Sequence, residues 1–175
     1  AEETKAAAEI ETVTSGKLTV ATSPDFAPYE FYAIGEDGTP KLAGFDMDLA
    51  QYIADYLGLE LEVVTVDFDG VISELQTKSV DLGMAGLSPD EKRMGIMDFS
   101  DLYYMGGQSL VTVKDNAEKY NSFEAINKPD VSVGAQVGSI QMDLANENSP
   151  EADIVGLPKV TDIISELLTG KMDAA

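Results

Sequence analysis

The sequence has 175 residues, of which 44% are hydrophobic and 25% are charged, enough apolar material for one sizeable core or two small ones. Its 32 acidic and 11 basic residues give a formal net charge of -21, and this field argues against nucleic acid as a partner because it repels phosphate groups. Histidine and cysteine are absent, which excludes Ser-His-Asp triads, cysteine nucleophiles and zinc sites built from these ligands.

The chain from residue 17 onward alternates β-branched runs with amphipathic stretches. Residues 1–16, rich in Ala, Thr and Glu, are expected to form a flexible tether. The elements predicted next are a strand at 18–21, a hairpin strand at 29–33 with its turn at 35–38, a helix at 46–57 ended by Gly58, a strand at 61–66, a helix at 70–78 and a strand at 80–85. This alternation is typical of an α/β fold with a largely parallel sheet.

A short helix is predicted after the third strand. Ser88 is followed by Pro89 and, three positions on, by Glu91, which is the pattern of a capping box with Ser88 as the N-cap. Residues 103–113 are expected to cross to a second α/β unit. The elements predicted there are a strand at 131–135, a helix at 139–146, a strand at 154–157, a helix at 160–168 and the approach to another strand at 171–175.

Several short motifs carry a resemblance to a known family. The run Gly44-Phe45-Asp46-Met47-Asp48-Leu49, continued by Ile53, Ala54 and Leu57, resembles the signature of the polar amino-acid-binding family of ABC transporter solute-binding proteins, family 3. Matches at the family's spacing follow at Asp67-Phe68-Asp69-Gly70, at residues 81–86, at Arg93, at Asp98-Phe99-Ser100 and at Tyr103-Tyr104. The similarity continues from about residue 16 to residue 175.

The resemblance implies a fold and a division of the chain. It implies an α/β, two-lobed periplasmic-binding-protein-like (type II) sandwich, whose lobes close on a ligand by a hinge. Lobe 1 is expected at 17–107, the hinge crossing at 108–113 and lobe 2 at 114–175. We expect both lobes to be incomplete, because the sequence stops before the return crossing. The aspartate that usually pairs with the ligand's ammonium is expected about three positions past Ala175.

The resemblance also implies a function. It implies an extracytoplasmic protein, in the periplasm or at the cell surface, that captures a polar amino acid for the permease of an ABC importer, without a cofactor or metal. A lipid anchor would be carried by a segment outside this sequence. Two alternatives stay open: a sensory ligand-binding ectodomain, and a dehydratase-like enzyme in which Glu30 and Asp25 are the candidate acids. Unfinished sheets with exposed edges also predict self-association of this chain.

Arg93 is the central candidate of the ligand site and the only arginine in the sequence. It matches the family's carboxylate-binding arginine, and a planar guanidinium holds a carboxylate through two parallel hydrogen bonds. By the same resemblance the hydroxyl and N–H of Ser88 meet the carboxylate, and the carbonyl of Gly86 accepts from the ammonium. Gly138 and Ser139 resemble a second carboxylate-binding helix start.

The remaining candidates concern the ligand's side chain. Phe26 and Phe68 match aromatic positions that sandwich it. Ser23 stands where several relatives carry an acid, so we expect a ligand that is not strongly cationic. Asp90 replaces a usual threonine and puts a negative charge near the carboxylate site. Asp69, with Asp67, lacks the further oxygen ligands of a calcium loop and is interpreted as a helix cap.

Overall fold

The computed structural model describes residues 10–175, so the predicted tether at 1–16 lies largely outside the described residues. Two compact units are present: Ala1–Val66 with Gly70–Leu87, called unit 1, and Asp67–Asp69 with Ser88–Ala175, called unit 2. This division by contacts differs from the lobe boundaries expected from the sequence, which stay a prediction. Within residues 10–175, no helix combines the length and the hydrophobicity needed to cross a bilayer.

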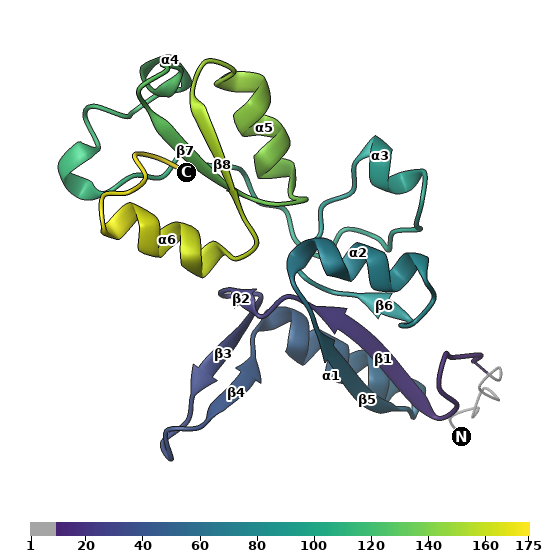
Figure 1. The fold of residues 1–175 in the computed structure, drawn as a ribbon. Helices are drawn as coiled ribbons and strands as arrows, with labels where there is room; N and C mark the ends of the chain where they lie inside the picture. The colour runs from purple at the N-terminus through teal and green to yellow at the C-terminus, as the bar shows by residue number, and fades with distance from the viewer. Residues whose placement is uncertain (1–9) are drawn as a thin grey trace. The chain divides into compact units, whose positions relative to one another are not determined.

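Unit 1 is built on a parallel three-stranded sheet in the order β5-β1-β6 (Figure 1). Its strands are β1 (Lys17–Thr22), β5 (Glu60–Thr65) and β6 (Leu82–Gly83). The predicted third strand at 80–85 is therefore shorter than expected. Directly before β6, the N–H of Thr19 donates to the side chain of Asp81 at 2.8 Å and not to a backbone carbonyl of the neighbouring strand.

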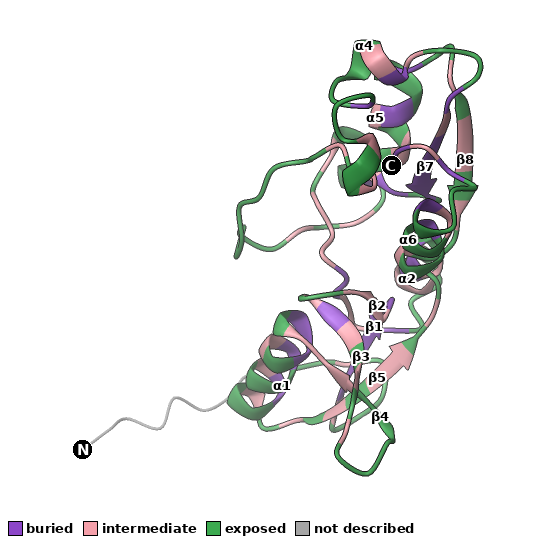
Figure 2. Cartoon of the chain, turned by 90° about the vertical axis from the view of Figure 1, so that its left-hand side faces the viewer, coloured by how far each residue is buried: buried purple, intermediate pink, exposed green. Residues whose placement is uncertain are grey.

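The hairpin and first helix of unit 1 form as predicted. Strands β3 (Glu30–Ile34) and β4 (Pro40–Ala43) are antiparallel, and a two-residue strand β2 (Asp25–Phe26), which was not predicted, pairs with β3. Helix α1 (Phe45–Leu57) ends at Gly58, whose φ of 70° is left-handed, as expected for a glycine C-cap. The inner face of α1 packs its buried alanines on β1, seen as the purple residues in Figure 2.

Gly44 makes the entry into α1 possible. Its φ is 129°, and a Cβ at this position would lie 2.1 Å from the carbonyl oxygen of Tyr29. That close approach fits the backbone hydrogen bonds that Phe45 and Asp46 donate to the carbonyls of Pro28 and Tyr29. Only glycine fits this turn, because any side chain would clash with the hairpin.

The start of helix α3 corrects one sequence prediction. Helix α3 is Glu91–Met94, and its N-cap is Asp90, not Ser88: the Asp90 side chain accepts from the N–H of Arg93 at 2.9 Å. Aspartate caps as well as serine does, and it stands directly before the first helical residue. Helix α2 (Phe68–Gln76) likewise begins one residue before Asp69, which therefore lies in its first turn and is not its cap.

Unit 2 is built on the parallel pair β7 (Ser132–Gln136) and β8 (Asp153–Leu157). Helix α5 (Ile140–Asn148) joins the core of Val133, Ala135 and Ile154, whereas α6 (Val160–Leu168) joins Val155 and Leu157. Since side chains alternate across a strand, the two helices cover opposite faces of the pair (Figure 1).

The remaining parts of unit 2 are short. They are the 3-10 helix η1 (Lys114–Asn116) and α4 (Phe123–Ile126). The expected crossing segment at 103–113 forms no regular element, although Val111 exchanges backbone hydrogen bonds with Ala175. Ala174 forms a parallel bridge with Val133, which confirms the predicted approach of residues 171–175 to a further strand position.

Candidate functional site

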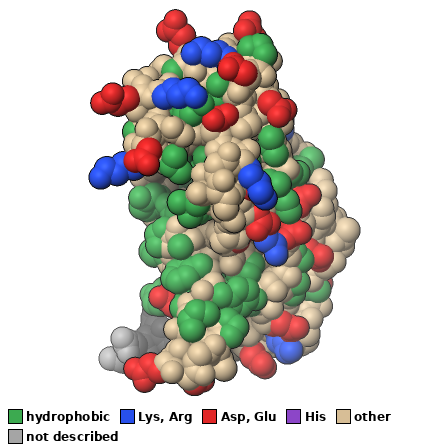
Figure 3. All heavy atoms as spheres, turned by 60° about the vertical axis from the view of Figure 1, so that its left-hand side comes forward, with side chains coloured by type: hydrophobic (Ala, Val, Ile, Leu, Met, Phe, Trp, Pro, Cys, Tyr) green, Lys and Arg blue, Asp and Glu red, His purple; other side chains and the backbone are tan. Residues whose placement is uncertain are grey.

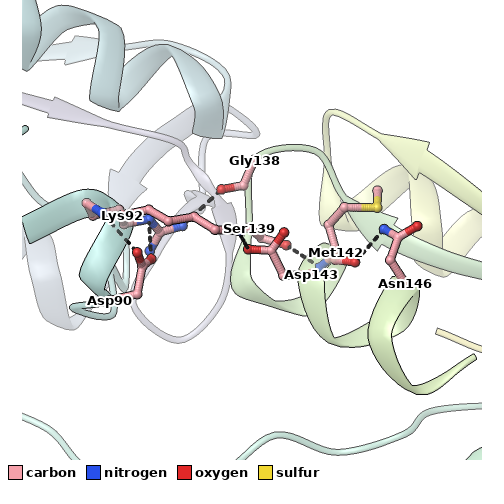
Figure 4. A network of polar contacts seen from close by, with 8 residues as sticks. Asp90, Lys92, Gly138, Ser139, Met142, Asp143 and Asn146 are labelled. Carbon is pink, nitrogen blue, oxygen red and sulfur yellow. Dashed lines mark hydrogen bonds and ion pairs between the residues drawn. The ribbon is translucent and has the colours of Figure 1, made fainter. Parts of the chain in front are cut away.

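Arg93 is the buried cation of unit 2, with 6% of its surface exposed. Its Nη1 donates to the carbonyl of Ser88 and its Nη2 to the carbonyl of Gly138, both at 2.9 Å. Its Nε lies 3.2 Å from Oδ2 of Asp90. Figure 4 labels two of these partners, Asp90 and Gly138, and draws their contacts as dashed lines. The guanidinium is therefore held at three points, and its side chain reaches Ser88 through the backbone carbonyl.

The hydrogen-bond count of Arg93 leaves room for one more partner. A guanidinium has five N–H donors in a fixed fork. Within residues 10–175 the hydrogen bonds use one donor on each Nη, and Nε lies in an ion pair with Asp90, so one donor remains on each Nη. Two N–H groups from one guanidinium are what a carboxylate needs for a bidentate pair. The guanidinium also lies over the ring of Phe68, with Cζ of Arg93 5.7 Å from the ring centroid.

Gly138 and Ser139 form the start of helix α5. Ser139 is the N-cap: its hydroxyl accepts from the N–H of Met142 at 3.2 Å and donates to the carbonyl of Gln136 at 2.7 Å. Gly138 has a φ of 77°, and a Cβ there would lie 3.0 Å from Cβ of Asp69. The predicted strand-to-helix turn is confirmed, and the hydroxyl of Ser139 is already occupied by its capping role.

An ion pair that the sequence did not reveal lies beside this network. Nζ of Lys92 is 3.0 Å from Oδ2 of Asp143, and both side chains are exposed (Figure 4). The hydrogen bond and charge of Asp143 raise the pKa of Lys92. The two residues lie 51 positions apart, so no local pattern indicated their pairing. On the face drawn in Figure 3, acidic side chains are spread over the surface, as their distribution in the sequence predicted.

The aromatic candidate of unit 1 is Phe26. Its ring stacks on Tyr29, with centroids 5.3 Å apart and planes 18° from parallel. Gly86, with a φ of 57°, leaves space for this ring, because a Cβ there would be 3.2 Å from it. Ser23 is buried, and its hydroxyl donates to Oδ1 of Asp25 at 2.6 Å. The position of Ser23 thus holds a serine whose hydroxyl contacts an acid.

Glu30 is the perturbed carboxyl group of unit 1. It is fully buried, and neither of its oxygens has a hydrogen-bonding partner at standard geometry among the described residues. Burial, together with the nearby negative charges of Asp46 and Asp25, raises the pKa of Glu30 to about 10. Asp46 is buried as well, and its Oδ2 accepts from the N–H of Gly86 at 2.9 Å. Asp46 thereby supports the backbone at Gly86.

The eight candidate residues fall into two groups. Arg93, Ser88, Phe68, Gly138 and Ser139 belong to unit 2. Ser23, Phe26 and Gly86 belong to unit 1. Direct contacts join Arg93 to Ser88, Phe68 and Gly138 in the first group, and Gly86 to Phe26 in the second. Their roles toward a ligand stay predictions.

Comparison with known protein families finds one match. The family model described as bacterial extracellular solute-binding proteins, family 3, matches residues 18–137. This stretch contains six of the eight candidate residues, all but Gly138 and Ser139.

Individual proteins are similar over most of the chain. The arginine-binding extracellular protein ArtP of Bacillus subtilis is 35% identical over 161 residues, which are 91% of this chain and 60% of the relative. Cyclohexadienyl dehydratase of Pseudomonas aeruginosa is 30% identical over 91% of this chain and 58% of its own length. The chain thus spans about 60% of the curated relatives it matches.

Solved structures agree with the fold. An amino acid ABC transporter substrate-binding protein from Streptococcus pneumoniae, bound to L-arginine, superposes with a TM-score of 0.86 at 39% identity, over 91% of this chain and 65% of that one. An ancestral amino acid-binding protein described as a precursor of cyclohexadienyl dehydratase superposes with a TM-score of 0.84 at 38% identity, covering 68% of that chain. The α/β fold expected from the sequence is that of amino-acid-binding proteins.

Proposed function

Because this chain belongs to the bacterial extracellular solute-binding proteins of family 3, we propose that it binds a free amino acid outside the cell. In this proposal the amino acid is passed to the membrane permease of an ABC importer. Arg93 holds the carboxylate of the ligand, and Ser88, Gly138 and Ser139 line the same end of it. A lipid anchor on a segment outside this sequence is part of the proposal.

The observation that carries the proposal is the buried guanidinium of Arg93. Burying a charge is costly unless it is paired and hydrogen-bonded. Two backbone carbonyls accept from two of its donors, Asp90 pairs with its charge, and one donor on each Nη is left for an anion. A carboxylate has the charge and the two acceptor oxygens that such a pair of donors can bind. Every free amino acid supplies one.

The charge of the ligand's side chain is less clearly indicated than the binding of its carboxylate. Ser23 in place of an acid predicts a ligand that is not strongly cationic. Two observations favour a basic side chain instead: Asp25 contacts Ser23 at 2.6 Å, and similar proteins are named for binding arginine or histidine. A comparison of L-arginine with citrulline, which has the same shape without the charge, separates these two cases.

Titration calorimetry on the whole protein tests the proposal. We expect a dissociation constant near the micromolar range, about -8 kcal/mol, for at least one of L-arginine, L-histidine and L-glutamine. Arg93→Ala should abolish this binding, and Arg93→Lys should weaken it strongly because an ammonium cannot form the bidentate pair. Lys171→Ala, which removes an exposed cation paired with Glu166, is the matched control. Unchanged affinity in Arg93→Ala would reject the proposal.

We propose that the chain is not an enzyme, although one similar protein is named a dehydratase. The acid with the strongly raised pKa is Glu30, and it is fully buried, where it cannot touch a ligand. An acid catalyst has to reach the proton that it transfers. Incubation with prephenate should therefore give no product, and measurable turnover would favour the dehydratase alternative.

A further inference from the structure

Asp90 contacts Arg93 twice. Its Oδ1 accepts from the backbone N–H of Arg93 at 2.9 Å, and its Oδ2 lies 3.2 Å from Nε of the same residue. The Arg93 side chain is 7% exposed and that of Asp90 is 29% exposed. One carboxylate therefore caps helix α3 and also neutralises the buried end of the guanidinium.

The geometry points to Asp90 as a positioning residue for the carboxylate-binding arginine: we infer that its Oδ2 fixes the Nε edge of Arg93, so that the remaining Nη donors are presented as a pair. This inference rests on the proposed function and adds a determinant of affinity to it. Threonine, the usual residue at this position in the resembling family, provides a cap without a charge.

Three contacts hold the planar guanidinium at the end of its flexible stem. The carbonyls of Ser88 and Gly138 hold one N–H of each Nη, and Asp90 holds Nε. Without Asp90 the guanidinium keeps only its two neutral acceptors, while its burial stays the same. The guanidinium must then be fixed in orientation when the ligand binds. The entropy lost in this step lowers the affinity for the ligand.

Removing the charge of Asp90 could also raise the affinity for the ligand. The direction of the measured change in affinity therefore tests the inference. The negative charge of Asp90 repels a bound carboxylate, so its removal would tighten binding if repulsion exceeded positioning. We expect positioning to prevail because the ion pair with the buried guanidinium of Arg93 neutralises the charge of Asp90 in place.

Capping and positioning are separated by Asp90→Asn and Asp90→Thr. Both side chains still accept from the N–H of Arg93 as an N-cap, but neither carries a charge for Nε. Glu91→Gln is the matched control, since it removes one negative charge from the next residue of α3. With whichever of L-arginine, L-histidine and L-glutamine the wild type binds most tightly as the probe in calorimetry, we expect both Asp90 variants to bind about tenfold more weakly, because the ion pair that orients Arg93 is lost. Glu91→Gln should bind as the wild type does.

A second measurement reads the position of Arg93 without any ligand. Arg93 is the only arginine within residues 1–175, and its Nε–H resonance in a nitrogen-15 spectrum is assigned by its absence from the spectrum of Arg93→Lys. Exchange of this proton with water should be about tenfold faster in Asp90→Asn and Asp90→Thr, because the ion pair that holds the Nε edge is lost, while the thermal midpoint stays close to that of Glu91→Gln.

The outcomes distinguish the inference from the proposed function. The inference alone is overturned by one set of results. Both Asp90 variants then bind the ligand as well as the wild type or more tightly, their Nε–H exchange is unchanged, and Arg93→Ala has lost binding. Undiminished binding in Arg93→Ala, or no binding of L-arginine, L-histidine or L-glutamine by the wild type, overturns both.

Discussion

Glu30→Gln is the most informative perturbation of the fold. Glu30 is fully buried beside Asp46, and its pKa is raised from 4.5 to about 10, first by burial and then by the charge of Asp46. In the folded protein the carboxyl group therefore keeps its proton at neutral pH, whereas in the unfolded chain it loses it near pH 4.5. Glutamine has the shape of the protonated acid and does not titrate.

The sign and size of the effect follow from linkage. Between pH 4.5 and pH 10 the folded state binds one more proton than the unfolded state, so the free energy of unfolding falls as pH rises. The slope is about 1.4 kcal/mol per pH unit, which amounts to about 2.7 kcal/mol between pH 6 and pH 8. Glu30→Gln lacks this pH-dependent contribution. Between pH 6 and pH 8 its free energy of unfolding should therefore rise by the same amount relative to that of the wild type.

Urea unfolding at pH 6 and pH 8, at constant ionic strength, measures the difference. The wild-type and variant curves share all other titrating groups, which cancel in the comparison. Glu36→Gln, at the exposed hairpin turn of the same unit, is the matched control and should show no such change. An equal stability difference between wild type and Glu30→Gln at both pH values would show that Glu30 is ionised in the fold and refute the reasoning.

Three further outcomes test the description of the fold and the site. Gly44→Ala should destabilise unit 1 by about 3 kcal/mol or more in urea unfolding, because its φ is 129° and its Cβ would clash with Tyr29; a loss below 1 kcal/mol would contradict the geometry. Ser139→Ala should cost about 1 kcal/mol, the value of one N-cap, and an unchanged midpoint would show that the cap contributes nothing. Lys92→Ala should leave the thermal midpoint unchanged, since exposed ion pairs contribute little, and a marked decrease would assign it a structural role.

Much of the secondary structure was predictable because it is encoded over short distances. The predicted helix at 160–168 has the observed bounds of α6, since its apolar residues recur at helical spacing and its ends are unambiguous. Gly58 ends α1 where the sequence indicated, because a left-handed C-cap depends on one residue.

The features that the sequence analysis missed or misplaced depend on contacts that the local sequence does not determine. Ser88 and Asp90 are both good caps two positions apart, and the choice between them depends on where the helix begins, which local sequence does not decide. The short strand β2 forms only because β3 lies beside it. The pairing of Lys92 with Asp143 joins residues from different helices.

The sequence by itself determined the alternation of strands and helices and, through the motifs that resemble it, the family, because both rest on residue type and spacing along the chain. The carboxylate-binding role of Arg93 stays a prediction from that resemblance. Only the tertiary structure decided that Arg93 is held by Asp90 and by the carbonyls of Ser88 and Gly138, and that Glu30 is buried with a raised pKa. Burial and electrostatic surroundings are set by residues distant in sequence, so they become defined only when the chain has folded.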